Sequence, residues 1–159
     1  RVSDDEQRFR SSSRWARCLR SSLDTEANNK RMSESTFRIA NPEKAKLPRL
    51  AFSDMKDAVL GKEYDLTLHI VSLAEIAALN KKYRDIDSPT DILSFPISET
   101  EGEMFINIEE TKKEAVKFDR EYENFFGFLF IHGLTHLLGM DHGSTMERIE
   151  VRFRKQFGI

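Results

Sequence analysis

At 159 residues and 18.5 kDa, with 39% hydrophobic and 33% charged side chains, the chain has the size and composition of one folded domain. No run of about 18 apolar residues occurs, which excludes a membrane-spanning helix, and a single cysteine, Cys18, excludes an internal disulfide framework and fits a reducing compartment. The formal net charge of −2 excludes a whole-domain field that attracts phosphate, so a nucleic-acid enzyme with this sequence would need a local basic patch.

Residues 1–31 differ in composition from the rest of the chain. They carry eight basic and five acidic residues, whereas the remainder has a net charge of −5. They are rich in Arg and Ser and hold too few apolar residues to fold alone. We therefore expect a disordered or spurious leader over 1–31 and a single domain over 32–159, starting near Met32. Organellar transit peptides are also rich in Arg and Ser but avoid acids, so we favour a cytoplasmic protein over an imported one.

From Met32 onward, the hydrophobic pattern predicts the order β-α-β-α-β-β-α-α-α. Strands are expected at Thr36–Ala40, Tyr64–Val71, Asp91–Phe95 and Met104–Ile108. Helices are expected at Pro48–Gly61, Leu73–Arg84, Glu109–Phe118 and Glu123–Leu138, with a last helix beginning at Ser144. The expected fold is α+β, with a small, mostly parallel or mixed sheet packed on one side by helices, in a topology like that of metalloproteases.

Local signals mark several helix ends. Ser72, followed three residues later by Glu75, is a capping-box pattern, and Ser144 with Glu147 repeats it. Gly139 follows the last periodic residue of its helix and is expected to end that helix in a left-handed conformation.

The strand Tyr64–Val71 has one apolar and one polar face, because Leu66, Leu68 and Ile70 alternate with Asp65, Thr67 and His69. His69 is on the polar face. We interpret it as a solvated strand residue and not as a metal ligand.

The most informative stretch is 125–142, FFGFLFIHGLTHLLGMDH. His132 and His136 are four residues apart on a predicted helix, so both rings leave one face and can converge on one ion. Beyond Gly139 the chain can fold back and bring His142 to them. The alternative is three hydrogen-bonded core histidines, but each unsatisfied buried polar group would cost about 1–3 kcal/mol, which a metal relieves. The helix is apolar nearly all round and should lie at the centre of the fold.

Three nitrogen donors with an open fourth position are the ligand set of a catalytic zinc site. Such a site can deliver hydroxide near neutral pH, and hydrolysis of either peptides or phosphodiesters is open to it. The spacing of His132, His136, Gly139 and His142 is that of metzincin proteases, whose general base is a glutamate directly after the first histidine. Gly133 stands at that position, so a cytosolic metallopeptidase is the less favoured alternative.

Three ordered blocks of sequence resemble one family. HGLTHLLGMDH resembles the signature H-G-x-L-H-L-x-G-Y/F-D-H of the YbeY-type endoribonucleases. NKKYRDIDSPTDILSFP and GEMFINIEETKKEA resemble two further blocks of that family. The resemblance covers roughly 65–150. It implies a compact α+β fold, one zinc ion, a bacterial cytosol or a bacterially derived organelle, and cleavage of single-stranded RNA.

The resemblance also implies partners and roles. The substrate would be small-subunit (16S) ribosomal RNA near its 3′ end, with a further role in the quality control of defective ribosomes. The ribosome and its small-subunit assembly proteins would be partners, there would be no membrane partner, and the protein would be a monomer. His132, His136 and His142 match the metal ligands, and Arg84 matches the functional arginine of the family. A guanidinium suits this role because it offers planar, bidentate donors to phosphate.

The sequence departs from the family pattern at three positions. Thr135 stands where leucine is usual, Met140 replaces an aromatic residue and Glu103 replaces an aspartate. Asp141 could orient a ligand imidazole or cap the turn.

The sequence thus predicts a zinc-dependent endoribonuclease with catalytic Arg84 and metal ligands His132, His136 and His142. It identifies neither the general base nor whether water or the ribose 2′-hydroxyl attacks. From a different class, a non-catalytic ribosome-assembly factor with a structural metal is a further alternative.

Overall fold

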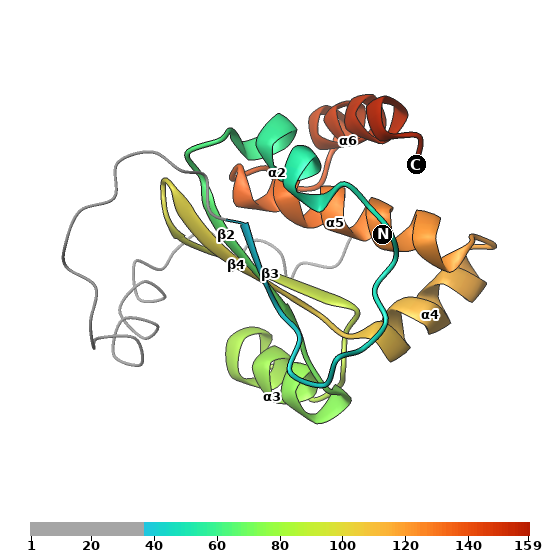
Figure 1. Cartoon of the computed structure of the whole chain (residues 1–159). Coiled ribbons are helices and arrows are strands. Elements are labelled where there is room, and N and C mark those ends of the chain that lie inside the picture. The colour runs from blue at the N-terminus through green and yellow to red at the C-terminus, as the bar shows by residue number, and fades with distance from the viewer. Residues whose placement is uncertain (1–36) are drawn as a thin grey trace.

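The computed structural model describes residues 37–159 (Figure 1), so the expected leader at 1–31 and the first residue of the predicted strand 36–40 lie outside the described residues. The strands are β1 Phe37–Ala40, β2 Asp65–Ile70, β3 Ile92–Ser98 and β4 Glu101–Ile106. The helices are α2 Phe52–Leu60, α3 Leu73–Arg84, α4 Ile108–Lys117, α5 Tyr122–Leu137 and α6 Ser144–Phe157. The predicted order of elements is confirmed over this range.

The four strands form one mixed sheet in the order β1-β2-β4-β3. β1, β2 and β4 are parallel neighbours, and β3 pairs with β4 in the antiparallel direction. The prediction that Pro96 closes β3 is wrong: the strand continues to Ser98. Proline is tolerated because β3 is an edge strand. The α+β prediction is confirmed.

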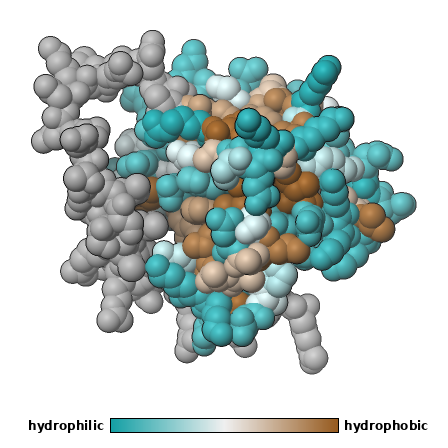
Figure 2. All heavy atoms as spheres, turned by 60° about the horizontal axis from the view of Figure 1, so that its bottom comes forward, coloured by the Kyte–Doolittle hydropathy of each residue, from teal (hydrophilic) through white to brown (hydrophobic). Residues whose placement is uncertain are grey.

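Helices cover both faces of this sheet. α2, α5 and α6 lie on one side and α3 lies on the other (Figure 1). The prediction of helices on one side only is wrong, because the second face also carries apolar residues: Ile76 of α3 packs on Leu93 and Phe95 of β3. Turned toward the viewer, the α3 side shows hydrophobic patches between hydrophilic ones (Figure 2). No helix among residues 37–159 combines the length and apolar character that a membrane crossing requires.

α5 is the central helix of the larger core, as the sequence predicted. Ten of its sixteen residues are buried. Phe130 of α5 packs edge-on against Phe52 of α2, with ring centroids 5.0 Å apart. On the sheet side, Leu66 and Leu68 of β2 are fully buried against the same cluster. This packing fixes the position of the helix that carries two of the three histidines.

The capping box at Ser72 is confirmed, since Ser72 Oγ accepts a hydrogen bond from the Glu75 N–H and the Glu75 carboxylate accepts one from the Ser72 N–H. The prediction of a capping box at Ser144 is wrong. Gly143 is the N-cap there and Ser144 is already helical, with no side-chain cap. The extended backbone of Gly143 begins the helix one residue earlier than the pattern indicated.

Two other predicted boundaries are wrong. α2 begins at Phe52 and not at Pro48, because the Leu50 N–H donates to the Pro48 carbonyl oxygen (3.1 Å) in a tight turn before the helix. β4 ends at Ile106 and does not reach residue 108. The reason is Asn107, which caps α4 by accepting a hydrogen bond from the residue 110 N–H at 2.9 Å.

Candidate metal centre

The three histidines of the sequence motif lie together at the end of α5. His132 and His136 occupy successive turns of that helix, and His142 follows the turn that leads to α6. Gly139 has φ +82°, so it adopts the left-handed conformation that the sequence predicted for the helix end. The chain therefore folds back and places His142 beside the other two.

The Nε2 atoms of the three rings converge. His136 Nε2 lies 3.1 Å from His132 Nε2 and 2.9 Å from His142 Nε2. One nitrogen from each ring lies within 4.8 Å of the others. For Zn–N bonds of about 2.0–2.1 Å and tetrahedral angles, ligand nitrogens lie about 3.3–3.4 Å apart, so these separations are close to those of a zinc site.

Hydrogen bonds fix the tautomers of two ligands. His136 Nδ1 lies 3.1 Å from the carbonyl oxygen of Met140, which can only accept, so Nδ1 carries the proton. His132 Nδ1 lies 2.5 Å from Oε1 of Glu150. In each neutral ring, Nε2 therefore carries a lone pair, and the two lone pairs face each other. Two neutral imidazoles alone would repel each other in this arrangement, whereas a cation between them stabilises it.

Glu150 is a site residue that the sequence motif did not reveal. It belongs to α6 and is 8% exposed. Burial raises the pKa of its carboxyl, but the hydrogen bonds from His132 and Thr135 outweigh burial and hold the pKa below its ordinary value. An ionised carboxylate on the far nitrogen of a ligand histidine orients that ring and strengthens it as a donor.

Thr135 has a defined role beside the ligands. It is fully buried, and its hydroxyl donates to the His132 carbonyl oxygen at 2.7 Å and lies 3.3 Å from Glu150 Oε1. The departure from leucine at this position thus places a hydroxyl beside the Glu150 carboxylate, with its one proton shared between the His132 carbonyl oxygen and Glu150 Oε1. Asp141, the orienting residue considered from the sequence, is exposed on the turn.

Burial keeps His136 in the neutral state that metal binding requires. Desolvation, together with the neighbouring rings of His132 and His142, lowers the pKa of His136 from 6.5 to about 4. At neutral pH this imidazole is uncharged and its Nε2 lone pair is available.

Gly133 lies where α5 meets the sheet. A Cβ atom there would lie 2.7 Å from Met104 Cε and 2.9 Å from both Ile92 Cδ1 and Ser94 Oγ. The position faces the packed contact between α5 and strands β3 and β4. A glutamate at 133 would have to enter this contact, so the site has no room for the general base of a metzincin protease.

An open cavity of about 310 Å³ lies beside the histidines. Its lining residues are His132, His142, Gly143, Ser144, Met146, Glu147 and Glu150. The charged residues in this lining are acidic, so within the described part of the chain no Lys or Arg borders the cavity.

Arg84 is the last residue of α3, on the other side of the sheet, and its side chain is exposed. It is not among the residues that line the cavity. The loop that follows it leads into β3, and Ile92 and Ser94 of that strand lie under Gly133 of α5. Arg84 therefore precedes, by one loop, the edge strand on which helix α5 packs.

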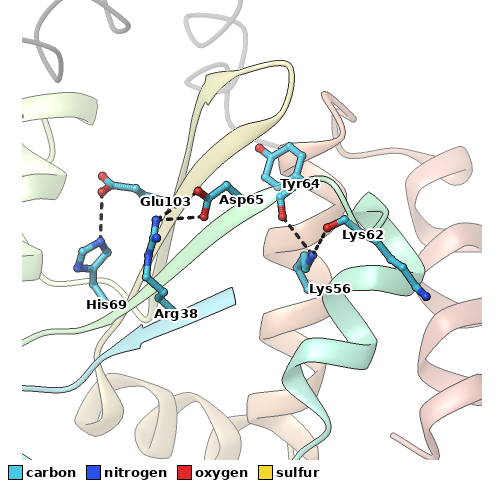
Figure 3. Close-up of polar contacts among 7 residues, drawn as sticks. All are labelled: Arg38, Lys56, Lys62, Tyr64, Asp65, His69 and Glu103. Atoms are coloured by element: carbon cyan, nitrogen blue, oxygen red, sulfur yellow. Dashed lines mark hydrogen bonds and ion pairs between the residues drawn. The ribbon is translucent and has the colours of Figure 1, made fainter. Parts of the chain in front are cut away.

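His69 lies away from the three histidines, on the side of the sheet that bears α3. Its ring stacks on Phe105 with centroids 4.5 Å apart, and its Nε2 lies 3.3 Å from Glu103 Oε1. Figure 3 shows this pair next to Arg38, which donates to Asp65 at 3.1 Å. His69 is partly buried and paired, so the prediction of a simply solvated side chain is wrong.

The same view shows a buried lysine with a structural role. Lys56 of α2 is fully buried, and its Nζ donates to the carbonyl oxygens of Gly61, Lys62 and Tyr64 (Figure 3 draws the last two). These bonds tie the end of α2 to the start of β2.

The comparisons with known proteins point to one family. The family model described as Endoribonuclease YbeY matches residues 30–157, a span that includes Arg84 and all three histidines. The protein named Endoribonuclease YbeY of Acholeplasma laidlawii is 36% identical over 104 residues, 63% of this chain and 72% of that protein. Its namesake in Oceanobacillus iheyensis is 33% identical over 108 residues, 58% of this chain and 70% of that protein.

One solved structure shows a likeness of fold alone. It is the solution structure of TM1509 from Thermotoga maritima, with a TM-score of 0.56 and 21% identity. The match covers 77% of this chain and 89% of that one.

Proposed function

The chain belongs to the YbeY endoribonuclease family, and on that premise we propose that it is a zinc-dependent endoribonuclease specific for single-stranded RNA. The observation that supports zinc most directly is the convergence of three Nε2 atoms. In His132 and His136, hydrogen bonds at Nδ1 hold the Nε2 lone pairs toward each other. His132, His136 and His142 would hold one ion. When bound, zinc would lower the pKa of a bound water to near 7 and would act as a Lewis acid toward a phosphoryl oxygen.

The protein's own groups prepare the site for this chemistry. Glu150 accepts a hydrogen bond from Nδ1–H of His132 and the Met140 carbonyl oxygen accepts one from Nδ1–H of His136, so both rings present Nε2. Burial keeps His136 neutral. The open cavity between the histidines and the start of α6 gives a strand of RNA access from solvent.

Arg84 is proposed to contact phosphate. In the resemblance to the family it occupies the position of the functional arginine, and a guanidinium can donate two parallel hydrogen bonds to a phosphate. Arg84 ends α3 and does not line the cavity, so the proposed contact with the substrate would lie outside the cavity.

The proposed substrate is small-subunit ribosomal RNA near its 3′ end, with a role in the quality control of defective ribosomes. The proposed partners are accordingly the ribosome and small-subunit assembly proteins. We further propose a cytoplasmic monomer. These points rest on the resemblance of the three sequence blocks to the family.

The packing of Gly133 disfavours a metallopeptidase. The position next to the first ligand histidine is filled by contacts with Met104, Ile92 and Ser94, so a peptidase base is missing for a structural reason. An assembly factor with a structural metal has the same ligands, and activity separates it from a nuclease.

The experiment is cleavage of labelled single-stranded and double-stranded RNA by the zinc-loaded protein, with zinc content measured on the same samples. We expect cleavage of the single strand, its loss in His136→Ala together with zinc, and a loss of at least tenfold in Arg84→Ala with zinc retained. Zinc-loaded protein that cleaves no RNA would contradict the nuclease. A substrate with one 2′-deoxy sugar at the cleavage site distinguishes the attacking group, since continued cleavage excludes the ribose hydroxyl.

A further inference from the structure

The contact between α5 and α6 continues beyond the metal centre. His132 of α5 contacts Glu150 of α6. Phe128, four residues before His132, contacts Arg154, four residues after Glu150. The Arg154 guanidinium carbon lies 5.2 Å from the centroid of the Phe128 ring. Four residues correspond to about 6 Å along a helix. The Phe128 and His132 rings are themselves in contact, with centroids 5.9 Å apart, so Arg154 lies about one turn from the metal centre.

A second arginine shares the same ring. Arg120, two residues before the first helical residue of α5, has its guanidinium carbon 5.0 Å from the Phe128 centroid. Two positive groups are thus held on one aromatic side chain. Burial, followed by the charge of Arg120, lowers the pKa of Arg154, as expected for two like charges in a partly desolvated place.

Both arginines have donors without acceptors. Arg120 Nη1 and Arg154 Nε are buried and have no hydrogen-bond partner. Among residues 37–159, no carboxylate forms an ion pair with either side chain. Glu150 precedes Arg154 by one helical turn, but its carboxylate already accepts hydrogen bonds from His132 and Thr135. The Phe128 ring attracts the two cations without accepting their hydrogen bonds in the way that an anion would.

The two unpartnered nitrogens are themselves buried, so a ligand would reach the remaining N–H groups of the two half-buried arginines. The cavity beside the histidines is bordered by Glu147 and Glu150, which repel phosphate. A strand of RNA lying in it needs a positive group next to it. We propose that Arg120 and Arg154, held on Phe128, bind a backbone phosphate of the RNA strand adjacent to the phosphate that lies at the metal centre. The inference rests on the proposed function and adds a phosphate subsite to it.

The test measures binding and cleavage separately. The zinc-loaded full-length chain is mixed with a short fluorescent single-stranded oligouridylate, and anisotropy is read in stopped flow before turnover, at several salt concentrations. Cleavage is followed on the same samples. The variants are Arg120→Gln, Arg154→Gln and Arg154→Lys. Arg152→Gln is the matched control, because Arg152 is exposed on the same helix and the change in net charge is the same.

We expect Arg120→Gln and Arg154→Gln each to weaken RNA binding about tenfold at low salt. Each should also reduce the slope of log affinity against log salt by about 0.7, the value for one lost phosphate contact on a single strand. KM should rise with kcat little changed, Arg154→Lys should recover part of the affinity, and Arg152→Gln should keep the wild-type slope.

A role in packing alone would lower thermal stability without changing the salt slope. Folded Arg120→Gln and Arg154→Gln that both keep the wild-type affinity and slope would overturn the subsite while leaving the nuclease intact. Wild-type protein that binds RNA but does not cleave it would overturn the proposed catalysis, and the change in slope would still establish the subsite.

Discussion

Nδ1 of His132 lies 2.5 Å from Oε1 of Glu150, and this contact joins the helix that carries two histidines to the helix that follows the third. Its effect is to fix the tautomer of His132 with Nε2 toward His136. It also ties the orientation of a metal ligand to the packing of α6, since Glu150 is buried between the two helices. The metal centre is thus a property of both helices and not of the histidine motif alone.

Replacing Glu150 by glutamine tests this contact. Glu150→Gln keeps the size of the side chain but removes the charge that strengthens His132 as a donor. We expect zinc affinity to fall about 10–100-fold, as is typical when an outer partner of a ligand histidine is lost. Competition with a chromophoric chelator measures the affinity. Glu123→Gln, an exposed change in the first turn of α5, is the matched control, and an equal loss in both variants would contradict the role of Glu150.

The metal-free protein should lose stability as the pH falls from about 6.5 to about 4. The pKa of His136 is about 4 in the folded protein, against an ordinary value of 6.5. In that interval the unfolded chain binds a proton at His136 that the folded chain does not, so unfolding becomes easier as pH decreases, by a few kcal/mol at most. Urea unfolding at several pH values measures this. His136→Gln should flatten the curve over the same interval, and an unchanged slope would count against a neutral, buried His136.

Gly133 should be intolerant of any side chain. A Cβ atom would lie 2.9 Å from Ile92 Cδ1 and 2.7 Å from Met104 Cε, so Gly133→Ala should lower the free energy of unfolding by about 1–2 kcal/mol, although alanine favours the helix. Ile92→Val removes the Cδ1 atom. The double variant should therefore be less unstable than the sum of the two single variants. Strict additivity in urea unfolding would show that the two side chains do not meet.

Two serines at helix starts have the same sequence pattern but different structures. Ser72 caps α3 through its hydroxyl, whereas Ser144 lies inside the first turn of α6 without a side-chain cap. Ser72→Ala should cost about 1 kcal/mol of stability, and Ser144→Ala should cost much less. Thermal unfolding of both variants gives the comparison. Equal losses would show that the pattern, and not the observed capping geometry, determines stability.

The histidine cluster could be predicted because it depends on local geometry. His132 and His136 share a helix face by their spacing, and Gly139 permits the turn that returns His142. Glu150 could not be found in this way. Its contact with His132 depends on how α6 packs on α5. The two residues lie on different helices separated by a turn, so no periodicity within one element relates them.

The same distinction applies to the sheet and the arginines. Alternation in β2 predicted one polar face correctly, but the apolar residues that α3 covers come from β3, so the second layer depends on strand order. Arg120 and Arg154 are far apart in sequence and meet only through Phe128. The Ser144 pattern misled because Gly143, one residue earlier, had already begun the helix.

The central claim is that three Nε2 atoms bind one zinc ion. Anomalous X-ray diffraction at the zinc edge, from crystals of the zinc-loaded protein, locates the ion directly. The expected result is one strong peak at about 2.0–2.1 Å from Nε2 of His132, His136 and His142. A peak elsewhere, or full-occupancy zinc bound without any one of these nitrogens, would contradict the account.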